Sequence, residues 1–339
     1  MKPESTKMLF AFGITLAAAA AGCGKEGAED FADGVPQQED VKLVIPAGPT
    51  QAGALTAADG TTAVHGALLG EKAEFYTLTR DITVMVNTGT ASVLTLVKTI
   101  TGYPPSSVAA DTAVWGPFTD PLSPNTFRLT VNRLAPGQFH YVLDGKPKTA
   151  PDTAFVTVLS GTHNKVDPTA RRRANTPDYG SGDFLVDWDA MQTLPEHDTN
   201  VGKAAFTYSR LSPASDVNIG VTFTQVLDND TGKLIDATYG YTSTPGMGGS
   251  FDFEQTKDIV MTTAALEQLT VHSRWQETGA GRADTKITGG DLAAAQATLN
   301  ECWDSSFLSV YFTTSWADPT KSWGDESACA FVPAVYSAP

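Results

Sequence analysis

Residues 216–241, DVNIGVTFTQVLDNDTGKLIDATYGY, decide how this chain folds. Apolar and polar residues alternate from Val217 to Phe223, which is the period-two pattern of a strand with one buried face. Turn-forming residues follow at 228–232, and Gly232 can adopt the positive φ that such a turn needs. A second alternating run, Leu234 to Tyr241, then returns. The stretch therefore predicts a β-hairpin.

The same pattern recurs on both sides of this hairpin. Further candidate strands are Ala113–Trp115, Phe127–Arg133, Phe139–Asp144, Thr153–Ser160, Gly182–Trp188, Ala204–Arg210, Gly249–Glu254, Leu266–Trp275 and Arg282–Ile287. Gly, Asp, Asn and Pro separate most of them, and no helical pattern intervenes. Such a series predicts an antiparallel meander. A sheet of this size curls strongly, so we expect a half-barrel or a barrel.

Helices are expected at both ends of the sheet. From Gly70 to Ile100, apolar residues recur at three-four spacing, which predicts a helix. The many Thr and Val residues leave open a strand at 75–79 followed by a helix from Asn87. The alanine-rich stretch 291–303 predicts a C-terminal helix, followed by a closing strand at 307–312. The predicted fold class is α+β, mainly β: a large curved antiparallel sheet with an N-terminal helix and a C-terminal helix.

The charge of the chain restricts its partners. The 339 residues carry 23 Lys and Arg against 38 Asp and Glu, a formal net charge of −15. An acidic surface of this kind argues against nucleic acid and anionic lipid head groups as partners. The length is sufficient for one large domain or two ordinary domains with real cores.

The N-terminus has the features of an export signal. Lysines precede a short apolar run that ends in Ala20-Ala21-Gly22-Cys23. This ending resembles the lipobox of bacterial lipoproteins, and the resemblance implies cleavage after residue 22 and lipidation of Cys23. The alternatives are an ordinary secretory signal or a retained membrane anchor. Gly24 stands where inner-membrane lipoproteins carry Asp, so the resemblance implies the outer membrane.

This reading divides the chain into three parts. Residues 1–22 form the signal peptide, residues 23–53 a flexible tether rich in Gly, Pro and acidic residues, and residues 54–339 a single sheet domain.

The cysteine count agrees with an exported protein. Besides Cys23, only Cys302 and Cys329 are present. An even pair in an oxidising compartment predicts a disulfide between them, whereas a cytoplasmic protein would keep two free thiols.

No catalytic, metal or cofactor motif is evident, and no cofactor is expected. His163 and His272 are the candidates for a catalytic histidine, although isolated structural histidines are more common. The densest polar stretch supplies a candidate polar site, which consists of His272, Arg274, Glu277, Arg282 and Asp284. The two arginines flank a glycine turn, so they could pair with Glu277 and Asp284 or bind a carboxylate or phosphate. An Asp-rich turn at 228–236 resembles half of a calcium loop, or is simply a hairpin turn.

Three short stretches, Trp115-Gly116-Pro117, 186–190 and 281–284, resemble uncharacterised lipoproteins of myxobacterial type, a group without an assigned activity. The expected architecture is similar to lipoprotein carriers and lipid-binding lipoproteins. Two non-enzymatic functions therefore stay open: binding of a lipid or other apolar ligand in the curved sheet, and a structural or interaction role with a filled core. A hydrolase acting through the region 272–284 is the third hypothesis.

Overall fold

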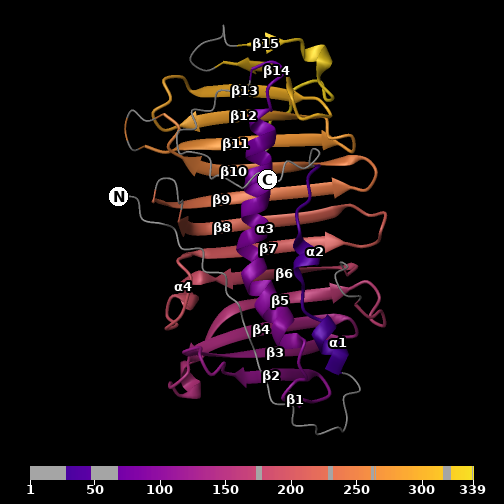
Figure 1. The fold of residues 1–339 in the computed structure, drawn as a ribbon, viewed down its shortest axis with the longest axis vertical. Coiled ribbons are helices and arrows are strands. Elements are labelled where there is room, and N and C mark those ends of the chain that lie inside the picture. Colours follow the sequence, from indigo (N-terminus) through magenta and orange to yellow (C-terminus); the bar gives the residue numbers. More distant parts are fainter. Residues whose placement is uncertain are drawn as a thin grey trace.

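The computed structural model describes residues 28–46, 68–172, 178–227, 232–260, 263, 265–315, 322–337 and 339. Its centre is one open sheet in which 15 antiparallel strands follow each other in sequence order (Figure 1). The strands are β1 (Ser107–Val108), β2 (Thr112–Phe118), β3 (Asn125–Ala135), β4 (Gln138–Pro147), β5 (Val156–Lys165), β6 (Gly180–Asp187), β7 (Lys203–Arg210), β8 (Val217–Leu227), β9 (Leu234–Thr244), β10 (Gly248–Lys257), β11 (Glu267–Gln276), β12 (Gly281–Gly289), β13 (Gln296–Trp303), β14 (Ser309–Thr314) and β15 (Trp323–Gly324). The predicted mainly β, antiparallel fold is confirmed, and the sheet is not closed into a barrel.

The predicted hairpin is β8 and β9. Val221 pairs with Tyr239, and both side chains face the core with 2% and 3% exposure. Gly232 has φ +69°, as the turn requires. Residues 228–231, which hold most of the suggested calcium loop, lie outside the described residues.

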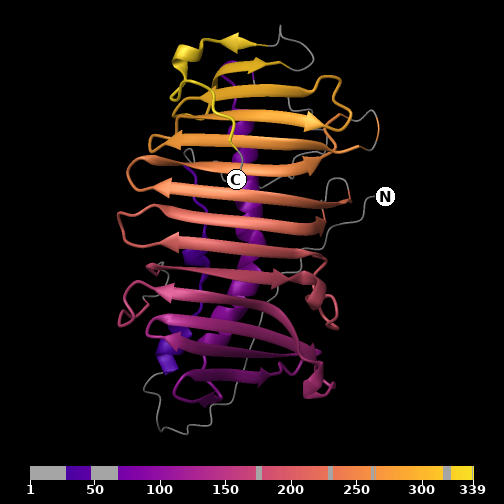
Figure 2. The same ribbon diagram turned by 180° about the vertical axis from the view of Figure 1, so that it is seen from behind.

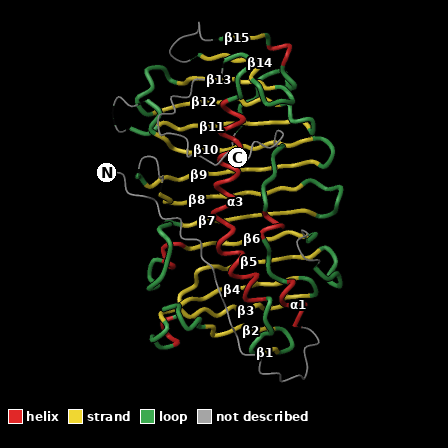
Figure 3. The backbone as a smooth tube through the Cα atoms, in the orientation of Figure 1, coloured by secondary structure: helices red, strands yellow, loops and turns green. Residues whose placement is uncertain are grey.

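The long helix α3 (Glu74–Thr101) crosses one face of the sheet at a steep angle to the strands (Figures 1 and 3). The predicted helix is therefore confirmed, and the alternative of a strand at 75–79 is wrong. Its threonines are compatible with the helix because several hydroxyls donate to the carbonyl four residues earlier, as Thr79 does to Phe75 and Thr83 to Thr79. Not every apolar residue of this stretch is buried: Met85 is 52% exposed.

A carboxylate from the far end of the sheet holds the start of α3. Glu301 on β13 is fully buried, and its Oε2 accepts a hydrogen bond of 2.7 Å from the Phe75 backbone N–H. This bond satisfies one of the free N–H groups of the first helical turn and places a negative charge at the positive end of the helix dipole. Two residues after the end of α3, the backbone carbonyl of Tyr103 accepts a hydrogen bond from the Trp115 indole on β2.

These two contacts show that the sheet curves around the helix. The 28 residues of α3 span about 42 Å. The distance along the sheet from β2 to β13 is eleven strand spacings, or about 53 Å. A helix shorter than the flat sheet reaches both strands most directly from the concave side of a curved sheet. We call this side the inner face and the opposite side the outer face.

The N-terminal segment of residues 28–46 also packs on the inner face. It contains α1 (Ala28–Asp33) and α2 (Gln38–Val41). Phe31, Val41 and Leu43 are at most 2% exposed, and Leu43 exchanges two backbone hydrogen bonds with the Asn87 side chain of α3. The prediction of a flexible tether over 23–53 is therefore wrong for 28–46. The rest of that stretch lies outside the described residues.

The predicted C-terminal helix over 291–303 is wrong. Residues 296–303 form β13, paired with β12 and β14. Alanine favours a helix, but strand pairing buries Leu299 and Trp303, and this burial outweighs the helix propensity of the alanines. The disulfide between Cys302 and Cys329 is confirmed.

The chain then continues along the outer face. Figure 2 shows the C-terminal segment on the side of the sheet opposite α3. The other short helices in the described residues are α4 (Trp188–Met191) and two 3₁₀ turns, Asp152–Ala154 and Glu326–Ala328. Among the described helices, none has both the length and the apolar character needed to span a membrane.

Candidate functional site

Four of the five residues of the candidate polar site lie together on the outer face. Asp252, His272, Asp284 and Asn300 are successive cross-strand partners, so they form one row over β10 to β13. Arg274 and Arg282 flank this row. We call these six residues the tail seat, because the C-terminal segment lies on them.

Asp284 is the centre of the tail seat. It is 1% exposed, and its two oxygens accept hydrogen bonds from Arg282 Nε at 2.6 Å, Arg274 Nη2 at 2.7 Å and Asn300 Nδ2 at 2.8 Å. Burial alone lowers the pKa of Arg282, but its hydrogen bonds to Asp284 and Glu326 outweigh this effect and raise that pKa. Arg282 therefore remains charged, and the two arginines share one buried carboxylate.

The tail, of which residues 330–337 and Pro339 are described, covers this arrangement. Val335 donates its backbone N–H to Asp284 at 2.9 Å, and Arg282 donates to the carbonyl of Phe331 at 3.0 Å. Tyr336 exchanges hydrogen bonds with the Asn300 amide. The guanidinium groups, which the sequence suggested for a carboxylate or phosphate, are thus already occupied by the chain itself.

The predicted pairing of the two arginines is correct for Asp284 as their partner and wrong for Glu277. Glu277 is exposed, and its backbone N–H donates to Met247. It lies in the tight turn after β11. His272 instead shares a hydrogen bond with Asp252 on β10 through Nδ1. The roles of Asp252 and Asn300 follow from strand register, which the local sequence pattern does not reveal.

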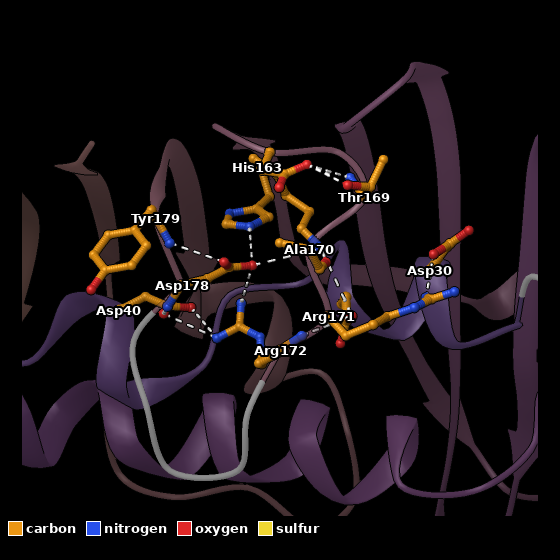
Figure 4. Close-up of polar contacts among 12 residues, drawn as sticks. Asp30, Asp40, His163, Thr169, Ala170, Arg171, Arg172, Asp178 and Tyr179 are labelled. Carbon is orange, nitrogen blue, oxygen red and sulfur yellow. Dashed lines mark hydrogen bonds and ion pairs between the residues drawn. The ribbon is translucent and has the colours of Figure 1, made fainter. Parts of the chain in front are cut away.

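A second polar cluster lies on the inner face and holds the N-terminal segment (Figure 4). Arg172 donates from Nη1 to both oxygens of Asp40 at 3.0 and 2.7 Å. The backbone N–H groups of Arg172 and Asp178 donate to Asp33 and Asp40, respectively. The side chains of Arg172 and Asp40 are 4% and 2% exposed. We call Asp33, Asp40, Lys165, Arg172 and Asp178 the N-terminal clamp.

His163 borders the N-terminal clamp from within the core. It is 1% exposed, with Nδ1 2.8 Å from the Tyr208 hydroxyl and Nε2 3.8 Å from Asp178. Burial is the main cause that raises the pKa of Tyr208, so the phenol stays protonated. The candidate catalytic histidine is therefore an internal one, enclosed by structural partners.

The neighbours of the Asp178 carboxyl change its pKa. Burial would raise its pKa, but the contact with His163 and the charges of Arg172 and Lys165 outweigh burial and lower it. The charged form of Asp178 is thus favoured by the buried cations around it. The clamp stabilises the packed N-terminal segment through the contacts of Arg172 with Asp40.

The space between α3 and the sheet is filled. The void beneath the helix, lined by Tyr76, Thr79, Ser273 and Trp303 among others, measures about 10 Å³, which is roughly the volume needed for one water. An acyl chain does not fit there. Among the described residues, no group of three or more His, Cys, Asp or Glu side chains is arranged to hold a metal ion.

Comparison with known proteins finds no match: no family model matches the sequence, and no curated protein or solved structure is significantly similar.

Proposed function

We propose that this chain is a non-enzymatic lipoprotein of the bacterial cell envelope that acts as a structural or interaction module with a filled core. The observation that supports this proposal is the packing of α3 against the inner face. Phe75, Val86 and Val97 of the helix are at most 1% exposed. The face that would bind an apolar ligand is thus the core of the protein.

The alternative of lipid binding requires an apolar cavity on the inner face. Pockets that bind small apolar molecules have volumes of roughly 300–1,000 Å³. The void of about 10 Å³ under α3 is far smaller. Lipid binding would therefore require α3 to leave the sheet.

The polar stretch 272–284 does not support the enzymatic alternative. Arg274 and Arg282 share the carboxylate of Asp284, Arg282 also pairs with Glu326, and both arginines contact the tail. A catalytic site needs at least one such group directed at an accessible substrate position. The outer face, by contrast, offers an extended polar surface to a partner.

Anchoring through Cys23 belongs to the same proposal and rests on the lipobox resemblance. We expect radiolabelled palmitate to be incorporated by the full chain and not by Cys23→Ser, and the variant to move from the membrane fraction to the periplasmic fraction. Equal labelling of both would contradict lipidation at Cys23.

The filled core is tested on a soluble form of residues 24–339 purified from a periplasmic host. An organic extract of this protein should contain no stoichiometric lipid when analysed by mass spectrometry. A lipid present at one molecule per protein would contradict the proposal and support the carrier alternative. A known lipid-binding protein purified from the same host serves as the positive control.

A further inference from the structure

Four turns along one edge of the sheet each expose an apolar side chain. Leu134 lies at the end of β3, Val166 directly after β5, Leu211 directly after β7 and Met247 in the β9–β10 turn. These side chains are between 53% and 71% exposed. Every second turn of an antiparallel meander lies at the same edge, so all four turns are on one side of the sheet, on the right in Figure 1. We call this side of the sheet the apolar edge.

The four turns form an evenly spaced row. Neighbouring turns at one edge are two strands apart, or about 10 Å, so the row is about 29 Å long. Each turn also contains an exposed proline, which adds apolar surface without an N–H group that needs a partner; these are Pro136, Pro168, Pro213 and Pro245. Single exposed apolar residues are common on proteins, whereas a row of them marks a surface that contacts another apolar phase.

The start of the N-terminal segment lies at the same edge. Asp30 of α1 pairs with Arg133 at 3.5 Å, and Asp33 lies 3.8 Å from Lys165 Nζ. These two cations immediately precede the exposed apolar residues of the first two turns. Ion pairs and the burial of Phe31 thus fix α1 beside the apolar edge.

A short stretch of sequence connects α1 to the proposed anchor. Cys23 is five residue steps from Ala28, the first residue of α1, and five steps extend to at most about 18 Å. An anchored chain therefore keeps α1 and the apolar edge near the bilayer surface. The opposite edge lies beyond this reach, because β3 covers about 27 Å between Asn125 and Arg133.

Other surfaces fit a bilayer less well. Leu122, at the opposite edge, is 95% exposed, but an anchored chain cannot bring it to the lipid. Above the inner face, Met85 is exposed on α3 together with polar residues, namely Asp81, Thr88, Thr95 and Lys98. The apolar edge combines exposed apolar side chains with proximity to the anchor.

We propose that the apolar edge docks on the lipid bilayer, with its four exposed apolar side chains in the head-group region and the strands standing on the membrane. This inference rests on the proposed anchoring through Cys23 and names the surface that faces the lipid. Four partly exposed side chains bind weakly by themselves, so docking orients the anchored protein. Asp167 and Asp216 lie exposed in the same turns, so the contact suits zwitterionic lipid and gains nothing from anionic lipid.

The test attaches the soluble form, residues 24–339, to vesicles without using Cys23. A hexahistidine tag before residue 24 binds a nickel-chelating lipid in phosphatidylcholine vesicles. This form contains two cysteines, Cys302 and Cys329, and they form a disulfide. A cysteine introduced at one position can therefore carry a nitrobenzoxadiazole probe, whose fluorescence rises in an apolar environment.

Val166→Cys and Met247→Cys place the probe on the apolar edge, and Leu122→Cys places it on the opposite edge as the matched control. On vesicles, the fluorescence of the first two should rise at least about twofold, as for groups that enter the lipid interface. Lipids brominated in their acyl chains should quench this signal. The Leu122→Cys probe should keep its emission, and phosphatidylglycerol should raise none of the signals.

Leu134→Ser combined with Leu211→Ser tests whether the row acts together. These changes remove apolar area from the apolar edge, so the Val166→Cys probe should lose at least about half of its gain. Leu122→Ser is the control and should leave that gain unchanged. All replaced side chains are exposed, so the variants should fold, which circular dichroism and thermal melting verify.

Equal signals from both edges, no signal from the apolar edge, or a full signal in the double serine variant would overturn the inference. A gain without vesicles that grows with protein concentration would overturn it in favour of contact between copies of the chain. Palmitate labelling of Cys23 separates this inference from the proposed anchoring. Labelling without a signal at the apolar edge rejects docking alone, whereas a vesicle-dependent signal without labelling rejects the anchor alone.

Discussion

At the scale of single residues, the molecule depends on a few buried charges that are paired across distant parts of the chain. Asp284 and Arg282 illustrate this, as do Asp40 and Arg172. Breaking a buried pair is costly because the remaining charge stays in a poorly solvated site. The two pairs attach the C-terminal and N-terminal segments to opposite faces of the sheet.

Asp284→Ala should lower the free energy of unfolding by roughly 3–5 kcal/mol, because it leaves the buried Arg282 without its carboxylate. Denaturant unfolding measures this change. Asp216→Ala is the control, since Asp216 is exposed and should cost at most about 1 kcal/mol. A similar small loss in both variants would contradict the central role of Asp284.

Acid should weaken the N-terminal clamp through Asp178. Because its pKa is lowered in the folded protein, the carboxylate contributes stability above the pKa of the unfolded chain, and this contribution is lost as the pH falls through the folded pKa. We expect Asp178→Asn to be less stable than wild type at pH 7 and to lose less stability below about pH 4.

Unfolding free energies measured from pH 7 to pH 2 test this expectation. Asp216→Asn, which removes one exposed carboxylate, is the control. Parallel acid profiles for wild type and Asp178→Asn would show that the clamp does not depend on this charge.

At the scale of elements, α3 is positioned by residues that are remote in sequence. Glu301 lies 226 positions from Phe75, yet it binds the first turn of the helix. Because Glu301 is fully buried, this contact with the free N–H groups of the helix terminus gives its carboxyl group a favourable polar partner.

Glu301→Gln keeps the shape of the side chain and removes its charge, so it should cost about 1–3 kcal/mol of unfolding free energy. Glu277→Gln, at an exposed turn position, should leave stability within about 0.5 kcal/mol of wild type. Thermal or denaturant unfolding of both variants provides the comparison. Equal stability of the two would argue against capping of α3 by Glu301.

The sequence predicts most of these elements because their signals are local. The alternation around Val221 and the three-four spacing after Gly70 are decided by neighbours a few residues away. The prediction of a helix over 291–303 is wrong because it rests on local alanine propensity, whereas the pairing of β13 with β12 and β14 decides the structure. The arginines and Asp284 of the tail seat could be predicted from the local sequence. Asn300 could not, because it lies beside Asp284 only through the pairing register of β12 and β13.

At the scale of the whole molecule, one helix takes the place that a ligand would have in a curved sheet. The open sheet is limited at its ends by β1 and β15, each two residues long. Short edge strands reduce pairing with other chains. The inner face is therefore a core, the edges are blunt, and the outer face is the surface available to partners.

The central claim is that α3 is a permanent part of the core. Native-state hydrogen exchange of residues 74–101 tests it most directly, since amides of a core helix open only in large unfolding events. We predict that the backbone amides near the buried residues Phe75, Val86 and Val97 exchange as slowly as the amides of β11 and β12. Exchange of the whole helix at a much lower free energy than the sheet would contradict this claim, because α3 would then be a lid over a ligand site.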